Sequence, residues 1–287
     1  MNIHKVLVAG AGTMGQGIAQ WFAQQEIAVE LLDVDETFAH SASAKIYASW
    51  DRLQERGKFS QQQVASFKTR LKVVNSNTVC PEQDLLIEAI VENLAVKKKF
   101  FRTMQEKLVT SCIFASNTSS FPMTDLCGDL PAVRRAKFLG LHFFNPATIM
   151  KLVEVISGQW TPHQLAQDFI AWFTEQKKIP VLCKESPGFI VNRVARNFYG
   201  EALQIAHAED REKFAQIDRV MEEVGGFPMG PFRLMDLIGI DVNYQVTQSV
   251  WHAFNDAPRF APHPLQKTMV ASAQLGKKTG VGFYRYD

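Results

Sequence analysis

The amino-acid sequence predicts an α/β fold, with a doubly wound sheet, an inserted helical pair and an all-α C-terminal domain. Three observations favour this fold class. An apolar run at residues 5–9 leads into a glycine-rich turn, a helical pattern and a second apolar run. Apolar strand-like runs then alternate with helical patterns up to about residue 185. The remaining pattern is helical almost throughout, so we expect domains at residues 1–185 and 186–287.

The glycine-rich turn has the spacing Gly10-x-Gly12-x-x-Gly15. In a strand–turn–helix unit, Gly10 allows the tight turn, Gly12 lets the backbone approach a pyrophosphate, and Gly15 lets helix and strand pack closely. The N–H groups and the positive dipole end of the following helix favour phosphates. This predicts a Rossmann-like dinucleotide-binding unit; the alternative is that the glycines serve only a turn.

The second apolar run ends at Asp33. A carboxylate at this place, about twenty residues after the turn, can accept hydrogen bonds from a ribose 2′-OH. The same carboxylate would repel a 2′-phosphate. The sequence therefore favours NAD over NADP as the cofactor.

Residues 36–72 interrupt the alternation with two helical patterns joined near Gly57. Between positions 40 and 72, seven lysines and arginines stand against two acids. Such a charge run is usually a solvated helix face. The alternative is that a few of these cations, with Lys58 at the bend as the first candidate, contact a polyanionic part of a substrate.

Two strand-to-loop passages follow at residues 84–93 and 111–120, with a helical pattern between them. Glu92 and the cluster SNTSS (116–120) fall at the carboxyl ends of these predicted strands, where ligands bind in a doubly wound sheet. Ser119 in that cluster is either a site residue or an ordinary helix cap, and both interpretations stay open.

Two further apolar runs, 138–144 and 151–156, flank the turn-like sequence NPAT. Paired as neighbours, they bring His142 within reach of Glu154, an acid that is costly to bury without a partner. An imidazole held in one tautomer by a carboxylate can remove the hydroxyl proton of a secondary alcohol at neutral pH. The alternative is a buried structural ion pair without a catalytic role.

The last predicted strand, at residues 179–183, gives way to Ser186 and Pro187. These two residues fit an N-cap and the first position of a helix, which would open the C-terminal domain. Asn192 falls in the first turns of that helix. Its amide is either plain polar surface or a group that closes over a cleft at the domain junction.

Composition and charge narrow the class of protein. Apolar residues make up 46% of the chain, charged residues 21%, and the formal net charge is +2, so no global attraction to nucleic acid or membranes is expected. The four cysteines form no CxxC pair and have no histidine at ligand spacing, which argues against a disulfide framework and a metal site. With no secretory signal and no membrane-length apolar run, we expect a cytoplasmic protein.

Eight segments, in order along the whole chain, resemble the NAD-dependent L-3-hydroxyacyl-CoA dehydrogenases, and among them the short bacterial 3-hydroxybutyryl-CoA dehydrogenase type. These segments are GAGTMGQGIAQ, EAIVENLAVK, SNTSS, GLHFFNP, MKLVEVI, SPGFIVNRV, GGFPMGPFRLMDLIGID and LGKKTGVGFYRY. The resemblance implies the reversible oxidation of an L-3-hydroxyacyl-CoA to the 3-oxoacyl-CoA with NAD as the cofactor. It also implies a homodimer formed through the helical C-terminal domain.

The resemblance further implies residue roles. His142 matches the catalytic base and Glu154 the acid that orients it, while Ser119 and Asn192 match residues that hold the reactive end of the substrate. The positions implied to contact the cofactor are Asp33, Glu92, Lys97 and Asn145, together with the three glycines. The inserted helical pair is where the family docks CoA, which makes Ser49, Arg52 and Lys58 candidates, on a looser match.

Small departures from the family pattern concern the fit of acyl chain or CoA. The sequence SSFP stands where a leucine commonly follows the paired serines, and Tyr47 and Trp50 place aromatic rings in the inserted pair. Two other functions remain open. One is an NAD-dependent dehydrogenase of a related 3-hydroxy acid, of the sugar-acid or carnitine type; the other is a non-catalytic NAD-binding scaffold.

Overall fold

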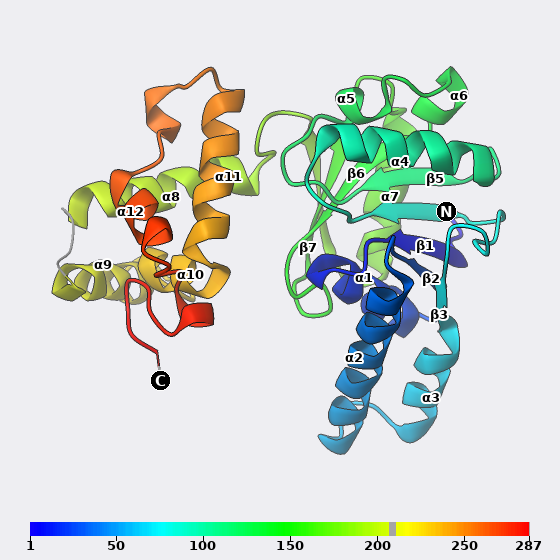
Figure 1. Ribbon diagram of the computed structural model, residues 1–287, viewed down its shortest axis with the longest axis horizontal. Coiled ribbons are helices and arrows are strands. Elements are labelled where there is room, and N and C mark those ends of the chain that lie inside the picture. Colours follow the sequence, from blue (N-terminus) through cyan, green and yellow to red (C-terminus); the bar gives the residue numbers. More distant parts are fainter. Residues whose placement is uncertain (207–210, 287) are drawn as a thin grey trace. The chain divides into compact units, whose positions relative to one another are not determined.

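An eight-stranded sheet organises the first of two units, residues 1–186 and 187–287, into which the chain divides (Figure 1). The structure is a computed structural model that describes residues 1–206 and 211–286. The strands lie in the order β3-β2-β1-β4-β5-β6-β7-β8. Their bounds are β1 (Lys5–Ala9), β2 (Ala28–Leu32), β3 (Leu71–Val74), β4 (Leu85–Glu88), β5 (Ile113–Ser116), β6 (Phe138–Phe143), β7 (Leu152–Ser157) and β8 (Ile179–Lys184).

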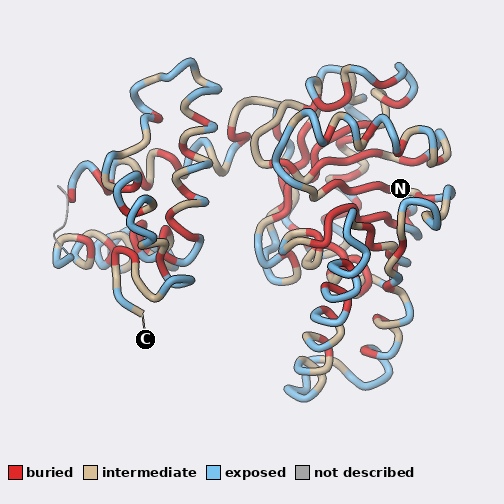
Figure 2. The backbone as a smooth tube through the Cα atoms, viewed as in Figure 1, coloured by how far each residue is buried: buried red, intermediate tan, exposed pale blue. Residues whose placement is uncertain are grey.

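Strands β1 to β6 run parallel to one another, β7 runs antiparallel to β6, and β8 runs parallel to β7. The strand order reverses between β1 and β4, which is where a doubly wound sheet binds its ligand. Both faces of the central strands are covered, and Figure 2 shows these strands buried along their length. The predicted α/β class is confirmed.

Helices pack on both faces of this sheet. Phe138 and Phe143 are five residues apart in β6, so they point to opposite faces. Phe143 packs against Trp21 and Phe173, with ring centroids 5.8 and 5.6 Å away, and Phe138 packs against Phe101 at 4.8 Å. Helices α1 (Thr13–Gln24) and α7 (His163–Glu175) therefore cover one face, and α4 (Leu94–Lys107) covers the other. The short helices α5 (Met123–Cys127) and α6 (Ala132–Arg135) complete the unit.

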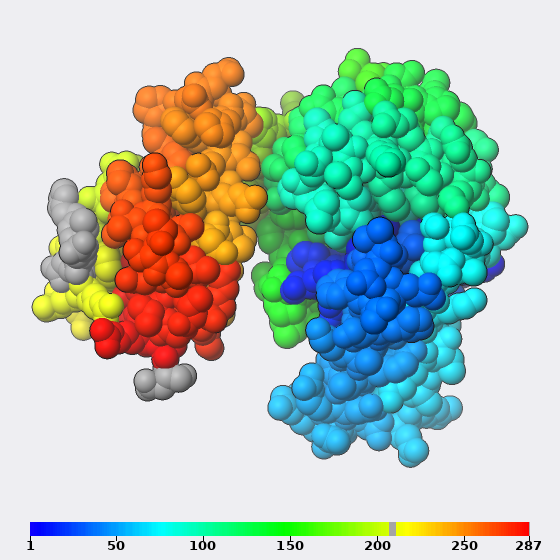
Figure 3. All heavy atoms as spheres, viewed as in Figure 1, coloured from blue at the N-terminus to red at the C-terminus, as the bar shows by residue number. Residues whose placement is uncertain are grey.

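The inserted helical pair is present as α2 (Glu36–Glu55) and α3 (Gln61–Arg70), and it extends beyond the sheet of its own unit (Figures 1 and 3). Asp35 and Ser60 cap the two helices, and Gly57 in the link has a φ of 67°, which favours glycine. The predicted end of the pair at residue 72 is wrong. The chain leaves the helix at Arg70 because Leu71 and Val74 are buried in β3 beside β2.

The second unit is helical, as the sequence predicts. Its helices are α8 (Val191–Ala206), α9 (Arg211–Glu223), α10 (Pro231–Ile238), α11 (Ile240–Ala253) and α12 (Pro264–Ala271), with 3₁₀ turns η1 (Pro258–Phe260) and η2 (Lys277–Thr279). The aromatic rings of Phe214, Phe232 and Phe283 form the centre of its core. Among the residues described in the two units, no helix is both long and apolar enough to cross a membrane.

The expected helix start at Ser186 and Pro187 is wrong. Gly188 and Phe189 have φ values of 72° and 49°, in the left-handed region, so the chain turns there before it can form a right-handed helix. Helix α8 begins only at Val191, which places Asn192 in its first turn.

Buried carboxylates explain the closing sequence GFYRY. Asp236 accepts hydrogen bonds from the backbone N–H groups of Phe283 and Tyr284 and from the Tyr286 hydroxyl, each at 2.9 Å. Asp218 accepts from the Tyr284 hydroxyl at 2.7 Å. The two carboxylates thus fix the C-terminal segment against α9 and α10.

Candidate active site

The glycine-rich turn joins β1 to α1. Gly10 has a φ of 101° and donates its N–H to the carbonyl of Leu32 at 2.7 Å. A Cβ atom at Gly15 would lie 1.7 Å from the Gly10 carbonyl oxygen, so only glycine fits there. A Cβ atom at Gly12 would meet nothing within 4 Å, which leaves open space beside the N-terminus of α1. A turn of this shape can hold the phosphates of a dinucleotide.

Asp33 follows the end of β2 and closes the same turn. Its Oδ2 accepts the N–H of Ala11 at 2.7 Å, and its Oδ1 accepts the N–H of Asp35 at 3.2 Å. The side chain is only partly buried. The carboxylate therefore lies beside the glycine turn with lone pairs left for a further donor.

A charge cluster lies at the carboxyl ends of β4 and β5, with Glu88 and Lys97 buried and the Glu92 side chain 36% exposed. The Lys97 side chain is 1% exposed, and its Nζ lies 2.5 Å from Oε1 of Glu88 and 3.0 Å from Oε2 of Glu92. Ser116 donates its hydroxyl to Glu88 at 2.6 Å, and Thr118 donates to Glu92 at 2.5 Å. Lys97 is thus held between two carboxylates.

The two carboxyl groups of this cluster differ. Burial raises the pKa of Glu88 despite the charge of Lys97. For Glu92, burial is outweighed by Lys97 and by the hydroxyl donors, which hold its pKa below the ordinary value. Sequence reasoning overlooked Glu88; the signal for it is an acid as the last residue of the apolar run LLIE.

His142 and Glu154 face each other across the antiparallel pair β6 and β7, where they are directly opposed in register. Nδ1 of His142 lies 2.7 Å from Oε2 of Glu154. Glu154 is 1% exposed and His142 7%, and the ring of Phe144 lies 4.5 Å from the imidazole. The prediction that the two strands pair and bring His142 within reach of Glu154 is confirmed.

The imidazole lies at the carboxyl-terminal end of the parallel strands, which is where a doubly wound sheet binds its ligand. Glu88, Ser116 and Gly140 are in register across β4, β5 and β6. His142 follows Gly140 by two residues in β6, so it lies just beyond the carboxyl ends of β4 and β5. The glycine turn leaves the neighbouring strand β1 at the same edge.

The SNTSS loop leaves β5 at this end of the sheet and leads to α5. Asn117 accepts the backbone N–H of Phe143 with its Oδ1 at 2.8 Å, which fixes the loop beside His142. Thr118 is buried against Glu92. Ser119 is half-buried, and within residues 1–206 and 211–286 its hydroxyl has no hydrogen-bond partner. It is therefore able to bond a ligand.

The loop after β6 carries Asn145, which is exposed. The loop is held by Lys178, whose ammonium donates to the carbonyls of Ala147 at 2.5 Å and Met150 at 2.7 Å and lies 4.8 Å from the centre of the Trp21 ring. Burial lowers the pKa of Lys178 to about 8. Lys178 is a further residue that the sequence pattern did not single out.

The remaining candidate residues belong to other elements: the inserted helical pair and the second unit. Ser49, in α2, accepts a hydrogen bond from the side-chain amide of Gln20 at 3.2 Å. Arg52 and Lys58 are exposed and form no ion pair within the described residues. Asn192 belongs to the second unit. Among the residues that the structure describes, no group of three or more His, Cys, Asp or Glu could hold a metal ion.

Comparison with known protein families decides the assignment. Residues 5–186 match the NAD-binding domain of 3-hydroxyacyl-CoA dehydrogenase, and residues 188–286 match its C-terminal domain. The chain belongs to the 3-hydroxyacyl-CoA dehydrogenase family. The predicted resemblance is confirmed, and NAD is the cofactor of its first domain.

Individual relatives agree with the family. The chain is 39% identical to a 3-hydroxyadipyl-CoA dehydrogenase of Escherichia coli over 99% of its own length, and it spans 59% of that longer protein. It is 37% identical to the mitochondrial hydroxyacyl-coenzyme A dehydrogenase of Rattus norvegicus, covering 99% of this chain and 91% of the relative. A solved (S)-3-hydroxybutyryl-CoA dehydrogenase from Ralstonia eutropha superposes with a TM-score of 0.89 at 35% identity, with both chains covered fully.

Proposed function

We propose that this chain catalyses the reversible NAD-dependent oxidation of an L-3-hydroxyacyl-CoA to the 3-oxoacyl-CoA, with His142 as the general base. The single observation that carries the proposal is the His142–Glu154 pair at the sheet edge that also bears the glycine turn. Family membership supports the same reaction.

His142 takes the proton of the C3 hydroxyl on Nε2, because Nδ1 is directed at Glu154. The Glu154 carboxylate fixes the ring orientation and stabilises the imidazolium that forms. When bound, NAD supplies the acceptor for the C3 hydride. Ser119 and Asn192 position the substrate oxygens by hydrogen bonds, so that proximity contributes much of the rate.

The residues around the glycine turn fit the cofactor. The open space at Gly12 and the N-terminus of α1 would receive the pyrophosphate, and Asp33 would accept the ribose hydroxyls. Glu92 and Asn145 lie at the same edge as further contacts. Lys97 acts through Glu92, since its ammonium is already bound by two carboxylates.

The inserted pair would hold the CoA portion. Arg52 and Lys58 are exposed cations near the end of α2, and Ser49 lies one turn before Arg52. Phosphate groups of CoA are the natural partners of such cations.

A homodimer through the second unit and a cytoplasmic location complete the proposal. Val220 on α9 is 54% exposed, Val224 just after the end of that helix is 82% exposed, and Leu237 on α10 is 53% exposed. Apolar side chains in such positions favour a partner surface. All four cysteines are free thiols, which suits a reducing compartment. Light scattering of the purified chain tests the dimer.

The reaction itself is tested with a series of 3-oxoacyl-CoA substrates from four carbons upward, following the oxidation of NADH and of NADPH. Acetoacetate and 3-dehydro sugar acids serve as controls that lack CoA. We expect turnover only with the CoA thioesters and with NADH. Turnover of the free acids would contradict the proposed reaction. Absence of turnover with every substrate would contradict it as well.

A further inference from the structure

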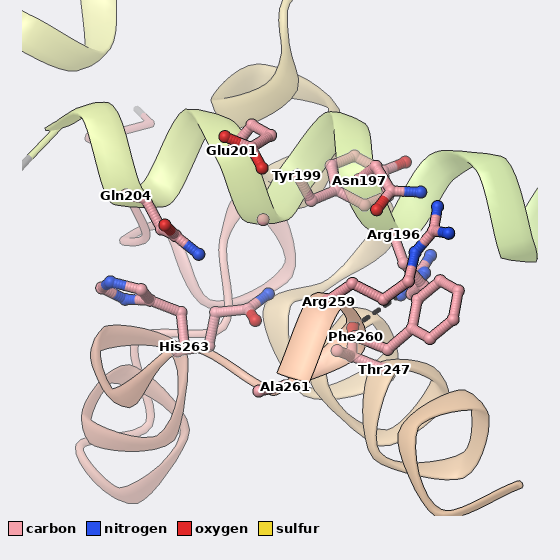
Figure 4. A pocket seen from close by; sticks show the side chains of 12 residues that line it. Arg196, Asn197, Tyr199, Glu201, Gln204, Thr247, Arg259, Phe260, Ala261 and His263 are labelled. Atoms are coloured by element: carbon pink, nitrogen blue, oxygen red, sulfur yellow. Dashed lines mark hydrogen bonds between the residues drawn. The ribbon is translucent and has the colours of Figure 1, made fainter. Parts of the chain in front are cut away.

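A polar pocket lies within the second unit, between α8, α11, α12 and η1 (Figure 4). It is separate in sequence from every residue assigned so far except Asn192, which precedes it on α8. Its lining includes Arg196, Tyr199, Thr247, Arg259, His263 and Gln266.

Arg196 is the unusual member of this lining. The residue is 6% exposed, yet it donates only to neutral acceptors: Nη1 to the carbonyl of Asn243 at 2.9 Å and the hydroxyl of Thr247 at 2.8 Å, and Nε to the carbonyl of Asn192 at 3.2 Å. Within the described residues it forms no ion pair, and Nη2 has no acceptor. Burial lowers its pKa to about 10. A buried guanidinium without a counter-ion is costly, so this one calls for an anion.

A second cation lines the same pocket. Arg259 in η1 is exposed, stacks on the Phe260 ring at 4.8 Å and forms no ion pair with any described residue. Figure 4 shows Arg196 and Arg259 reaching the same end of the pocket from opposite walls. Glu201 is the only carboxylate of the lining, and it is exposed and bonded to neither arginine in the part of the chain described. His263 uses Nδ1 to accept the N–H of Leu265.

Two guanidinium groups without an ion partner among the described residues fit an oxyanion, a carboxylate or a phosphate, which arginine binds through paired N–H donors. We take the carboxylate, because the phosphates of CoA are assigned to the inserted helical pair in the proposed function. Arg196 follows Asn192 by four residues, so the two side chains share one face of α8, about one helical turn apart. In the proposed function Asn192 holds the reactive end of the substrate. A carboxylate a few methylene groups beyond that end would reach Arg196.

We propose that Arg196, assisted by Arg259, binds the distal carboxylate of a dicarboxylic 3-hydroxyacyl-CoA. This inference rests on the proposed function and adds the substrate class. A free dicarboxylate is the other source of the same chemistry, and the two sources can be separated experimentally.

The test compares two substrates of equal chain length, 3-oxoadipyl-CoA and 3-oxohexanoyl-CoA, with NADH. We expect kcat/KM to favour the carboxylated substrate by about 10- to 100-fold, the value of a charged hydrogen-bonded contact. Arg196→Met should collapse this ratio, and Arg259→Met should reduce it. Arg233→Met, which alters an exposed arginine paired with Glu222 in the same unit, should leave the ratio unchanged.

Each alternative outcome is decisive. Equal kcat/KM values for the two substrates in the wild-type enzyme overturn the inference but leave the dehydrogenase function intact, whereas no turnover of either overturns both. If kcat/KM in Arg196→Met falls equally for both substrates while the oligomeric state changes, that result overturns the inference and shows that Arg196 instead pairs with a carboxylate of a second copy of the chain. If Arg196→Met does not fold, Arg259→Met decides by the same ratio. Adipate alone is also added to the wild type, and its effect on thermal stability is measured. Stabilisation by adipate together with equal kcat/KM for the two CoA substrates overturns the inference and assigns the pocket to a free dicarboxylate.

Discussion

Nδ1 of His142 and Oε2 of Glu154 lie 2.7 Å apart across two antiparallel strands, with both side chains buried. The register of β6 and β7 places them directly opposite each other, so the backbone itself fixes their distance. In the proposed mechanism, the other ring nitrogen, Nε2, accepts the proton of the substrate hydroxyl.

Replacing Glu154 with Gln tests the role of the carboxylate. The amide keeps the size of the side chain but cannot neutralise an imidazolium, so we expect kcat to fall by about 10²- to 10⁴-fold. KM for the acyl-CoA should change little. Steady-state kinetics of the variant measure both, and an unchanged kcat would show that Glu154 is only structural.

The glycine turn offers a matched pair of variants. Gly15→Ala places a Cβ atom against the Gly10 carbonyl, so we expect a loss of roughly 2 to 4 kcal/mol in the free energy of unfolding. Gly12→Ala meets no protein atom, so its stability should stay within about 1 kcal/mol of the wild type while NAD affinity falls. Urea unfolding and calorimetric titration with NADH separate the two effects. Equal NADH affinity in Gly12→Ala and the wild type would place the pyrophosphate elsewhere.

Lys97→Met removes the cation from the buried cluster at β4. Glu88 is then left unpaired in the interior, and the cost should be about 3 to 5 kcal/mol of unfolding free energy. The neighbouring Lys98→Met is the control, because Lys98 pairs with Asp129 at the surface and should cost less than about 1 kcal/mol. Similar losses for the two variants would contradict the buried pairing.

Lys178 predicts a pH dependence of stability. Its pKa is lowered by burial from 10.5 to about 8, so between these values the unfolded chain binds more protons than the folded one. Stability should therefore rise with pH across this window, by roughly 3 kcal/mol at most. In Lys178→Met that rise should be absent, whatever the overall stability of the variant. The free energy of unfolding is measured at several pH values between about 8 and 10.5 for both proteins. An equal rise with pH in the wild type and in Lys178→Met would refute the prediction.

The sequence allowed much of this fold and site to be predicted because the signals were local. The unit from Lys5 to Asp33 combines a strand, three spaced glycines and an amphipathic helix, all within one stretch of chain. The pairing of His142 with Glu154 followed from strand alternation and a short connection, which leave few other registers.

The features that were missed depend on contacts distant in sequence. Leu71 becomes a strand residue because β2 lies beside it, and Glu88 and Lys97 pair only once α4 packs on the sheet. The turn at Gly188 displaced the expected N-cap at Ser186, since positive φ values cannot be deduced from the dipeptide Ser-Pro. The burial of Arg196 likewise arises from tertiary packing in the helical unit.

The most direct measurement of the central claim is turnover of acetoacetyl-CoA and NADH by His142→Gln, alongside NADH binding by the same protein. Loss of measurable turnover with NADH affinity close to that of the wild type is the result expected of a general base outside the cofactor site. Wild-type kcat in the variant would contradict the assignment of His142.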